Sequence, residues 1–197
     1  MFRHQKTPDT KAAGFKNKVA ALAKNKKGVS AIEFALLAPV FILLLFASFD
    51  AVLALNAQRK ITVAANVVSD LATRDDSISC SDRDGLVTLA HTIITPFDIN
   101  ASEVVFSGLR VEPDGRNAIV EWSEGSPGAD LLETGRRIDL PSEISPDTFL
   151  ILSNVSVPYT TQLGFLDQFA GGSLITLSDQ ALFSSRLGVD ILSDCTA

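Results

Sequence analysis

The sequence is poor in the side chains that most often carry chemistry. Its 197 residues include two histidines, two cysteines, one tryptophan and one tyrosine. It also lacks the Gly-x-Ser-x-Gly motif of serine hydrolases, the phosphate-binding Walker loop and the His-Glu-x-x-His motif of zinc proteases. We therefore expect no enzymatic activity, no small-molecule substrate and no cofactor.

The few metal-binding side chains are not spaced as ligands. His4 lies in the basic N-terminal segment, and His91 stands in an apolar stretch that favours a structural role over that of a catalytic base. The acid pairs that could bind calcium are Asp75 with Asp76 and Asp82 with Asp84. Because the spacing of an EF-hand loop is absent, we interpret these acids as a solvated surface and expect no metal site.

Positive charge is scarce beyond residue 28. Residues 1–28 hold eight of the 17 Lys and Arg residues and one acid, Asp9, whereas the rest of the chain holds 22 of the 23 acids. Such an asymmetry predicts that the basic arm and the acidic body face different surroundings. Since the arm directly precedes an apolar run, we interpret it as a segment that sets membrane orientation, and we expect no nucleic-acid binding.

A long apolar run follows the basic arm. Residues 34–49 carry no charge, and a helix over 29–50 is long enough to cross the roughly 30 Å hydrocarbon core at about 1.5 Å per residue. Because basic flanks stay in the cytoplasm, the sequence predicts a single transmembrane helix with the C-terminal part outside. The alternatives are a buried core helix and a secretory signal cut after Ala54, although Asp50 and the length of the run disfavour the signal.

Residues 51–75 are predicted to extend this helix with an amphipathic pattern. The apolar positions at spacings of three and four are Leu53, Ala57, Ile61, Ala64, Val68 and Leu71. The polar positions with the same rhythm are Arg59, Thr62, Asn66, Ser69 and Thr73. The apolar face can pack on the chain's own head or on a partner helix, and the pattern does not decide between them.

Residues 76–197 have the composition of a small mixed domain. "GLVTLAHTIITPF" predicts a helix that is capped by Asp82 or Asp84 and ended by Pro96. The expected strands are "SEVVFSGLRV" and "NAIVEWS", joined by a turn at "EPDGR", then "TFLILSNVSVPY" and "SLITLSDQALFSS", which flank a short helical piece at "LGFLDQF". Ala118, Val120 and Trp122 are expected to share one face. The predicted fold class is α+β, a long N-terminal helix followed by a small antiparallel sheet packed on helices.

One short stretch resembles a known processing signal. "KNKKGVSAIEFALLAPVFILLLF" is similar to the prepilin site of type IVb pilins, in which a basic leader ends in glycine and glutamate is the fifth residue after the cut. Here Gly28 precedes the cut, Val29 becomes the N-terminus, and Glu33 and Phe34 are the fifth and sixth residues. With Pro39 a few residues beyond Glu33, the stretch resembles the TadE-like pseudopilins of the tight-adherence (Flp) pilus.

This resemblance implies a role in pilus assembly. A prepilin peptidase would remove leader 1–28, and Glu33 would neutralise the new amine of Val29, commonly that of a neighbouring subunit. The implied partners are the bacterial inner membrane, the peptidase, other pilins or pseudopilins and the assembly platform, with the head in the periplasm and a place in an adhesive pilus. The alternatives are a Glu33 that only reaches the lipid headgroups, and a signal-anchored or secreted periplasmic domain with a binding or enzymatic task.

Weaker motifs extend the resemblance to the C-terminal half. "WSEG", Pro141, "VSVPY" and "ALFSSRLG" are arranged as in TadE-like or TadF-like pseudopilins, and the choice between these two branches stays open. Pro158 departs from the family's strand pattern because it cannot donate to a sheet ladder. The strand is therefore expected to end, or to lie at an edge, at Pro158.

The two cysteines both fall in the part predicted to lie outside. Cys80 and Cys195 do not form a Cys-x-x-Cys pair or a Cys/His ligand set. In an oxidising periplasm, a disulfide between the segment after the long helix and the C-terminal tail is expected. The alternative is two free thiols.

Overall fold

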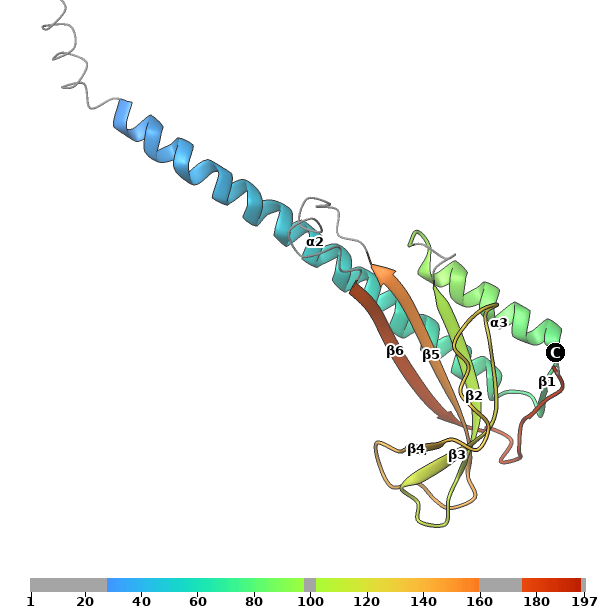
Figure 1. Cartoon of the computed structure of the whole chain (residues 1–197). Coiled ribbons are helices and arrows are strands. Elements are labelled where there is room, and N and C mark those ends of the chain that lie inside the picture. The colour runs from blue at the N-terminus through green and yellow to red at the C-terminus, as the bar shows by residue number, and fades with distance from the viewer. Residues whose placement is uncertain (1–27, 98–101, 160–174, 196–197) are drawn as a thin grey trace, which may run out of the picture. The chain divides into compact units, whose positions relative to one another are not determined.

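The computed structural model describes residues 28–97, 102–159 and 175–195. A long helix, α2 (Val29–Ala72), is followed by the short strand β1 (Ser77–Ile78) and helix α3 (Cys80–Ile94) (Figure 1). The later strands are β2 (Glu103–Val111), β3 (Asn117–Gly125), β4 (Arg137–Asp139), β5 (Phe149–Tyr159), β6 (Ile175–Ser184) and β7 (Leu192–Ser193). The predicted α+β class is confirmed. The helical piece expected at "LGFLDQF" lies outside the described residues.

The chain divides into two compact units, residues 1–48 and 49–197. Helix α2 is continuous across this division and contains Pro39 in its first part. It ends at Ala72, where the N–H of Thr73 donates to the carbonyl of Ser69 at 3.2 Å and the N–H of Arg74 to that of Leu71 at 3.2 Å. The amphipathic segment is thus helical as far as Ala72 and not to residue 75.

The second unit is built on a five-stranded antiparallel sheet with the order β4-β3-β2-β5-β6. Strands β5 and β6 pair over ten residues, from Leu150 opposite Ser184 to Tyr159 opposite Ile175. The second part of α2 and helix α3 pack on one face, which we call the helix face. Residues 126–147, which include β4, pack on part of the opposite face, which we call the loop face.

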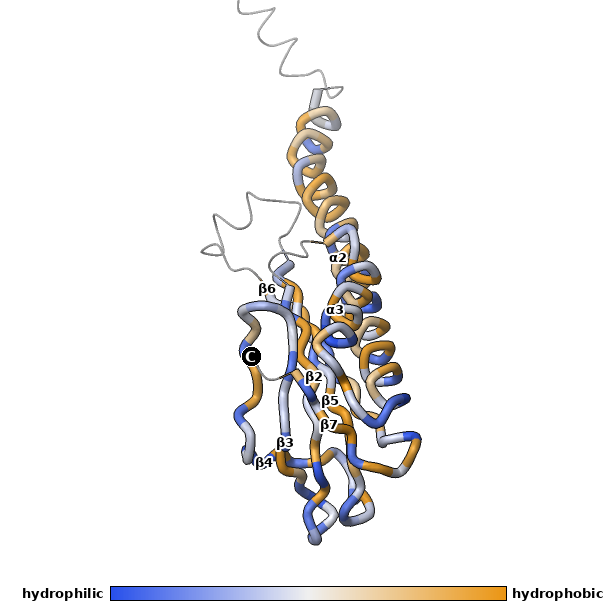
Figure 2. Tube along the Cα trace, turned by 90° about the vertical axis from the view of Figure 1, so that its right-hand side faces the viewer, coloured by the Kyte–Doolittle hydropathy of each residue, from blue (hydrophilic) through white to orange (hydrophobic). Residues whose placement is uncertain are grey.

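Each face of the sheet has its own core, and the alternation of apolar and polar residues along the strands is visible in Figure 2. On the helix face, fully buried residues of α2 and α3 pack against fully buried residues of the sheet. Large side chains in this core include Ile61, Val68, Ile94, Phe106, Ile151 and Val155. The loop-face core is smaller and contains Leu109, Val111, Ala118, Val120 and Leu150. The apolar face of the amphipathic helix therefore packs on the chain's own head.

A β-bulge in β3 changes the face of the sheet on which Trp122 lies. Gly108 pairs with Trp122 but Leu109 pairs with Val120, so that Glu121 is an extra residue on β3. The bulge turns Trp122 to the helix face, where its ring meets that of Phe106 edge-on at 6.3 Å. Gly108 leaves room for the indole, since a Cβ there would lie 2.4 Å from Trp122 Nε1. The prediction that Trp122 shares a face with Ala118 and Val120 was wrong.

Helix α3 begins earlier than the sequence suggested. Its N-cap is Ser79, whose hydroxyl accepts from the Asp82 N–H at 3.3 Å while the Asp82 carboxylate accepts from the Ser79 N–H at 3.0 Å. Asp82 is therefore the third helical residue of a capping box and not the cap, and Asp84 lies within the helix. The predicted end before Pro96 is confirmed, because the helix ends at Ile94.

Strand β5 continues through Pro158. Its pairing with β2 stops at Ser156, whereas its pairing with β6 continues through Pro158 to Tyr159. The Ser185 N–H donates to the Phe149 carbonyl, so the backbone groups of odd-numbered β5 residues bond to β6. The backbone groups of even-numbered residues, such as Pro158, face β2. Since β2 has already ended there, the missing N–H of Pro158 removes no ladder hydrogen bond. Pro158 thus occupies a local edge, and the strand does not end there.

Candidate functional site

Gly28 stands at the start of α2, which begins at Val29. A Cβ built on Gly28 would meet no described atom within 4 Å, and its φ is not in the left-handed region. Neither packing nor backbone conformation in the described part of the chain therefore requires glycine at this position. A glycine that the fold does not require, directly before a helix, is compatible with recognition by another protein.

Glu33 and Phe34 project from the early part of the same helix. Both are exposed, and the Phe34 side chain is 71% accessible. Val29 lies four residues before Glu33, which corresponds to about 6 Å of helix rise. None of the ion pairs among the described residues involves Glu33. The arrangement leaves the carboxylate open to a positive group from outside the first unit.

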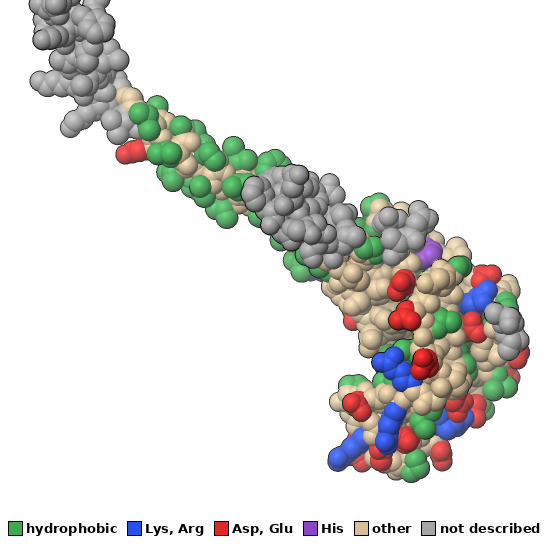
Figure 3. Space-filling view, viewed as in Figure 1, with side chains coloured by type: hydrophobic (Ala, Val, Ile, Leu, Met, Phe, Trp, Pro, Cys, Tyr) green, Lys and Arg blue, Asp and Glu red, His purple; other side chains and the backbone are tan. Residues whose placement is uncertain are grey.

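The rest of this part of α2 exposes mostly apolar side chains, and Figure 3 shows one face of it. Its large exposed side chains include Ile32, Leu36, Leu37, Val40, Phe41, Ile42, Leu43, Leu44, Leu45 and Phe46. Residues Ser30–Ala72 form one helix that is long and apolar enough to cross a membrane by length and composition. A helix that is hydrophobic all round and not buried in protein needs lipid or other helices around it.

A polar cluster fixes the second part of α2 on the sheet. Ser69, which is fully buried, donates to Ser153 Oγ at 2.9 Å, and Ser153 Oγ donates to the Ala65 carbonyl at 2.6 Å. The amphipathic pattern placed Ser69 and Thr73 on the outer polar stripe, and this was wrong because both side chains are fully buried. At this close contact between helix and sheet, the small hydroxyl groups make hydrogen bonds with backbone carbonyls and with each other. The spacing of apolar residues in the sequence does not predict such buried polar contacts.

The C-terminal end of β5 contacts α2 through Tyr159. Its hydroxyl donates to the Asp50 carbonyl at 3.4 Å, and its ring lies 6.3 Å from that of Phe97. Desolvation by burial, with a further contribution from the charge of Asp50, raises the pKa of Tyr159. The "VSVPY" strand thus presents Val155, Val157 and Tyr159 to the helix face.

The C-terminal residues 185–195, which we call the C-terminal strap, tie the helices to the sheet. Trp122 Nε1 donates to the Ile191 carbonyl at 2.7 Å, and Arg186 pairs with Asp70 of α2. The strap's Asp190 lies 2.7 Å from Arg110, and hydrogen bonds to Asp190 and Glu121 raise the pKa of Arg110. Sequence analysis did not find these contacts, since nothing in the local pattern of the tail indicates its distant partners.

A disulfide closes the strap. Cys195 is bonded to Cys80 at the start of α3, with a Cα–Cα distance of 4.8 Å and a sequence separation of 115 residues. Next to it, β7 pairs in parallel with β1, and the Asp194 N–H donates to the Ile78 carbonyl at 3.1 Å. The structure therefore contains the expected disulfide, in the second unit, whereas Gly28, Val29, Glu33 and Phe34 lie in the first.

The described residues do not form a catalytic or metal-binding cluster. No group of three or more His, Cys, Asp or Glu side chains in this part of the chain could hold a metal ion. His91 is half-buried on α3, its Nε2 makes no hydrogen bond within the described residues, and desolvation by burial lowers its pKa. Thr95 Oγ1 donates to the His91 carbonyl at 3.0 Å, but no hydrogen bond among the described residues joins a carboxylate or hydroxyl to the His91 ring.

Comparison with known proteins identifies the N-terminal segment. The family model of the TadE-like protein matches residues 28–69, which run from the glycine at the helix start to the buried serine of α2. No curated protein and no solved structure matches the chain. TadE-like proteins are pilus-associated structural proteins and are not known as enzymes. Residues 28–69 therefore form a TadE-like segment, as the sequence resemblance indicated.

Proposed function

We propose that this protein is a membrane-anchored pseudopilin, or minor pilin, that takes part in the assembly of a tight-adherence pilus. The TadE-like segment links the chain to Tad pilus systems in general. The more specific proposal is that a prepilin peptidase cuts after Gly28, that Val29 becomes the N-terminus, and that Glu33 acts in assembly. The observation that carries it is the position of an exposed, structurally unconstrained glycine directly before the TadE-like helix.

The chemistry of Glu33 supports an assembly role. Cleavage after Gly28 creates a positive amine on Val29, at the end of an otherwise apolar helix. A lone charge in lipid is costly, whereas opposite charges of neighbouring subunits attract strongly where the local dielectric constant is low. Glu33 has no partner among the described ion pairs, and its side chain is exposed on the helix. Pairing with the amine of another subunit would favour the assembled state over the isolated chain.

The proposed topology follows from charge and length. Residues 1–28 would be the cytoplasmic leader, 29–50 the membrane span, 51–72 the amphipathic extension, and the residues after it the rest of the periplasmic head. The apolar part of α2 can cross a membrane, and the excess of Lys and Arg before it favours a cytoplasmic N-terminus. The disulfide between Cys80 and Cys195 is compatible with an oxidising periplasm. The proposed partners are the inner membrane, the peptidase, other pilins and the assembly platform.

The assembly role is tested with variants of Glu33 in a host that expresses the pilus system but lacks the native copy of this protein. We expect Glu33→Ala to be processed and inserted but to reduce sheared surface pili at least tenfold, with partial recovery in Glu33→Asp. Asn56→Ala is the matched control, since Asn56 is an exposed polar residue further along the same helix. Full piliation by Glu33→Ala would contradict the proposed charge pairing.

A further inference from the structure

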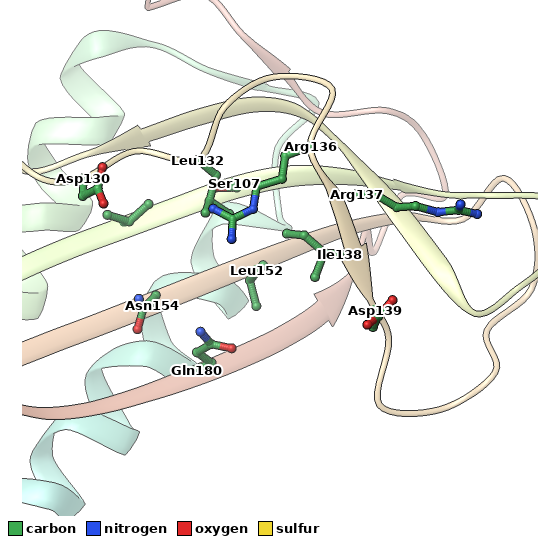
Figure 4. Close-up of a pocket in the computed structure, with 11 residues that line it drawn as sticks. Ser107, Asp130, Leu132, Arg136, Arg137, Ile138, Asp139, Leu152, Asn154 and Gln180 are labelled. Atoms are coloured by element: carbon green, nitrogen blue, oxygen red, sulfur yellow. The ribbon is translucent and has the colours of Figure 1, made fainter.

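Within the described residues, the two edges of the sheet have no strand on their outer sides. The strand order places β4 at one edge and β6 at the other, and no described strand pairs with the far side of either. The sheet curls so that Ile138 of β4 packs against the same loop-face core as Leu152 of β5 and Leu182 of β6. The two edge strands therefore border one groove, whose floor is formed by β2 and β5 (Figure 4).

The groove consists of two adjoining hollows that share Ile138, Asp139, Leu152 and Gln180. The first, of about 300 Å³, is the more polar and includes Arg136 and Asn154. The second, of about 360 Å³, is mostly apolar and is lined by leucines such as Leu109, Leu140 and Leu182. Each hollow has room for one or two side chains.

Strand β6 offers free backbone groups along this groove. The Ser185 N–H donates to the Phe149 carbonyl, and by the register the backbone groups of every second residue of β6 bond to β5 in the same way. The backbone groups of Leu182 and Ser184 consequently point away from β5. In the same alternate set, the Gln180 N–H donates to Asp179 Oδ1 at 2.9 Å and the Ser178 carbonyl accepts from Gln58 Nε2. The outward N–H and C=O groups in the second half of β6 are a template for an added strand.

The polar hollow contains groups without protein partners. Arg137 is held by Glu112 at 2.5 Å and by Asp114 at 3.2 Å, whereas Arg136 has no ion pair within the described part of the chain. Asn154 Oδ1 is buried and accepts no hydrogen bond there. Figure 4 shows Arg136 on the opposite side of the hollow from Asn154 and Gln180. A ligand with one carboxylate and one hydrogen-bond donor would satisfy both groups.

The carboxylates at the rim restrict the charge of that ligand. Asp130 and Asp139 line the same hollow and are exposed. They would repel a run of acids, so a ligand with a single acid next to Arg136 is favoured over a polyanion. The adjoining apolar hollow favours an aliphatic side chain. On an extended chain, side chains on one face recur every second residue, at about 6.6 Å.

We propose that this groove binds an extended peptide segment of another protein, which adds to β6 as a further strand. The segment carries an aliphatic residue and a single acid two positions apart. The aliphatic side chain fills the hollow over Leu152 and Leu182, and the acid pairs with Arg136. Main-chain hydrogen bonds to Leu182 and Ser184 provide the affinity, and the two hollows provide the specificity. This binding does not depend on processing at Gly28 or on charge pairing by Glu33.

The test is a selection of displayed decapeptides against the full-length chain in nanodiscs, followed by affinity measurement with fluorescein-labelled synthetic copies. We expect the selected peptides to combine an aliphatic residue with Asp or Glu two positions away. Arg136→Gln should weaken them threefold to tenfold, and a peptide with Gln in place of its acid should lose this sensitivity. Arg116→Gln is the matched control, since Arg116 is exposed and lines neither hollow.

Strand addition is distinguished from simple groove binding by two N-methylated forms of the best peptide. Methyl groups on one alternate set of backbone nitrogens remove the bonds to β6, while methyl groups on the other set leave them intact. We expect one form to bind at least tenfold more weakly and the other to bind within threefold of the parent. Equal weakening of both forms, selection of peptides without the acid, or no selection above the Arg136→Gln chain would overturn the proposal.

Discussion

At the scale of single residues, two buried serines hold the long helix on the sheet. Ser153 Oγ donates to the Ala65 carbonyl at 2.6 Å and accepts from Ser69 at 2.9 Å, and both serines are fully buried. In a contact without access to water, each hydroxyl offsets the desolvation of a carbonyl or of the other hydroxyl. Ser69 and Ser153 are therefore structural residues of the head, although the sequence shows only two ordinary polar positions.

Ser153→Ala should lower the free energy of unfolding by about 1–2 kcal/mol, because it removes one buried hydrogen bond and leaves the Ser69 hydroxyl with fewer partners. Urea unfolding, followed by the fluorescence of the single tryptophan, Trp122, measures this change. Ser156→Ala is the control on the same strand, since Ser156 is half-buried on the loop face. An equal loss in the two variants would contradict the role of the serine contact.

Asp70 links α2 to the C-terminal strap and makes stability depend on pH. A hydrogen bond from Arg74, together with the contacts of Arg186, lowers the pKa of Asp70 below its ordinary value of 3.8. Its stabilisation is therefore present above about pH 3.8 and is lost as the pH falls through the lower pKa of the folded state. Asp70→Asn should be less stable than wild type at pH 6, and this difference should shrink toward pH 2.

Unfolding midpoints of the two chains across this range provide the measurement. Asp75→Asn, a change at an exposed acid without an ion pair among the described residues, is the control and should show no such convergence. A difference between wild type and Asp70→Asn that stays constant from pH 6 to pH 2 would show that the carboxylate contributes nothing through its charge.

Residue roles were predictable where they depend on neighbours in the sequence. The end of α3 was predicted from Pro96. The roles of Gly28 and Glu33, which a local motif indicates, stay predictions. The orientation of Trp122 was not predictable, because it depends on one extra residue in the pairing of β3 with β2. Burial of Ser69 likewise results from a strand more than eighty positions away, at Ser153.

At the scale of elements, the C-terminal strap joins parts that are distant in sequence. It contacts the end of α2 through Arg186 and the sheet through Trp122, and Cys195 binds it covalently to α3 at Cys80. The two-residue strands β1 and β7 are too short to associate stably by themselves. The disulfide is therefore the main constraint on the end of the chain.

Replacement of Cys80 and Cys195 by serine should lower the free energy of unfolding by about 2–4 kcal/mol, because the open chain gains entropy when it unfolds. Urea unfolding of this variant and of the reduced wild-type chain provides the comparison. The two should agree, since both lack the same bond. A variant as stable as the oxidised wild type would show that the bond does not constrain the unfolded chain.

Strands and helices were predicted well because their periodic patterns are local. The four longer strands β2, β3, β5 and β6 correspond to apolar segments that the sequence identified. Strand β4 was not among the predicted strands, since three residues are too few to show an alternation. The predicted start of α3 was too late in the sequence, because Asp82 is a good cap residue by itself. Only the backbone shows that Ser79 is the N-cap.

At the scale of the whole molecule, the second part of α2 belongs to the core of the head. Residues 49–197 form one compact unit, and Ile61, Ala64 and Val68 of α2 are fully buried within it. A fragment that begins at residue 49 should therefore fold cooperatively, whereas one that begins at residue 76 should not. Dispersion of amide resonances in the two fragments is the measurement. A folded 76–197 fragment would show that the helix is dispensable.

The general architecture was predictable from the sequence, but the sides on which its parts meet were not. Charge asymmetry and the apolar run indicate a membrane segment, and alternating strands indicate an α+β head. The amphipathic pattern could not decide between the chain's own sheet and a partner helix, since both offer an apolar surface. The groove between β4 and β6 arises from the curl of the sheet, for which the sequence has no local signal.

The central claim is that a prepilin peptidase converts this chain into a pilin-like subunit that begins at Val29. Its most direct test is the intact mass and N-terminal peptide of the protein from bacterial envelopes, with and without a co-expressed prepilin peptidase. The account predicts a membrane-bound chain that starts at Val29 only when the peptidase is present, and an uncut chain in Gly28→Leu. An intact basic arm in both cells, or a start near Leu55, would contradict it.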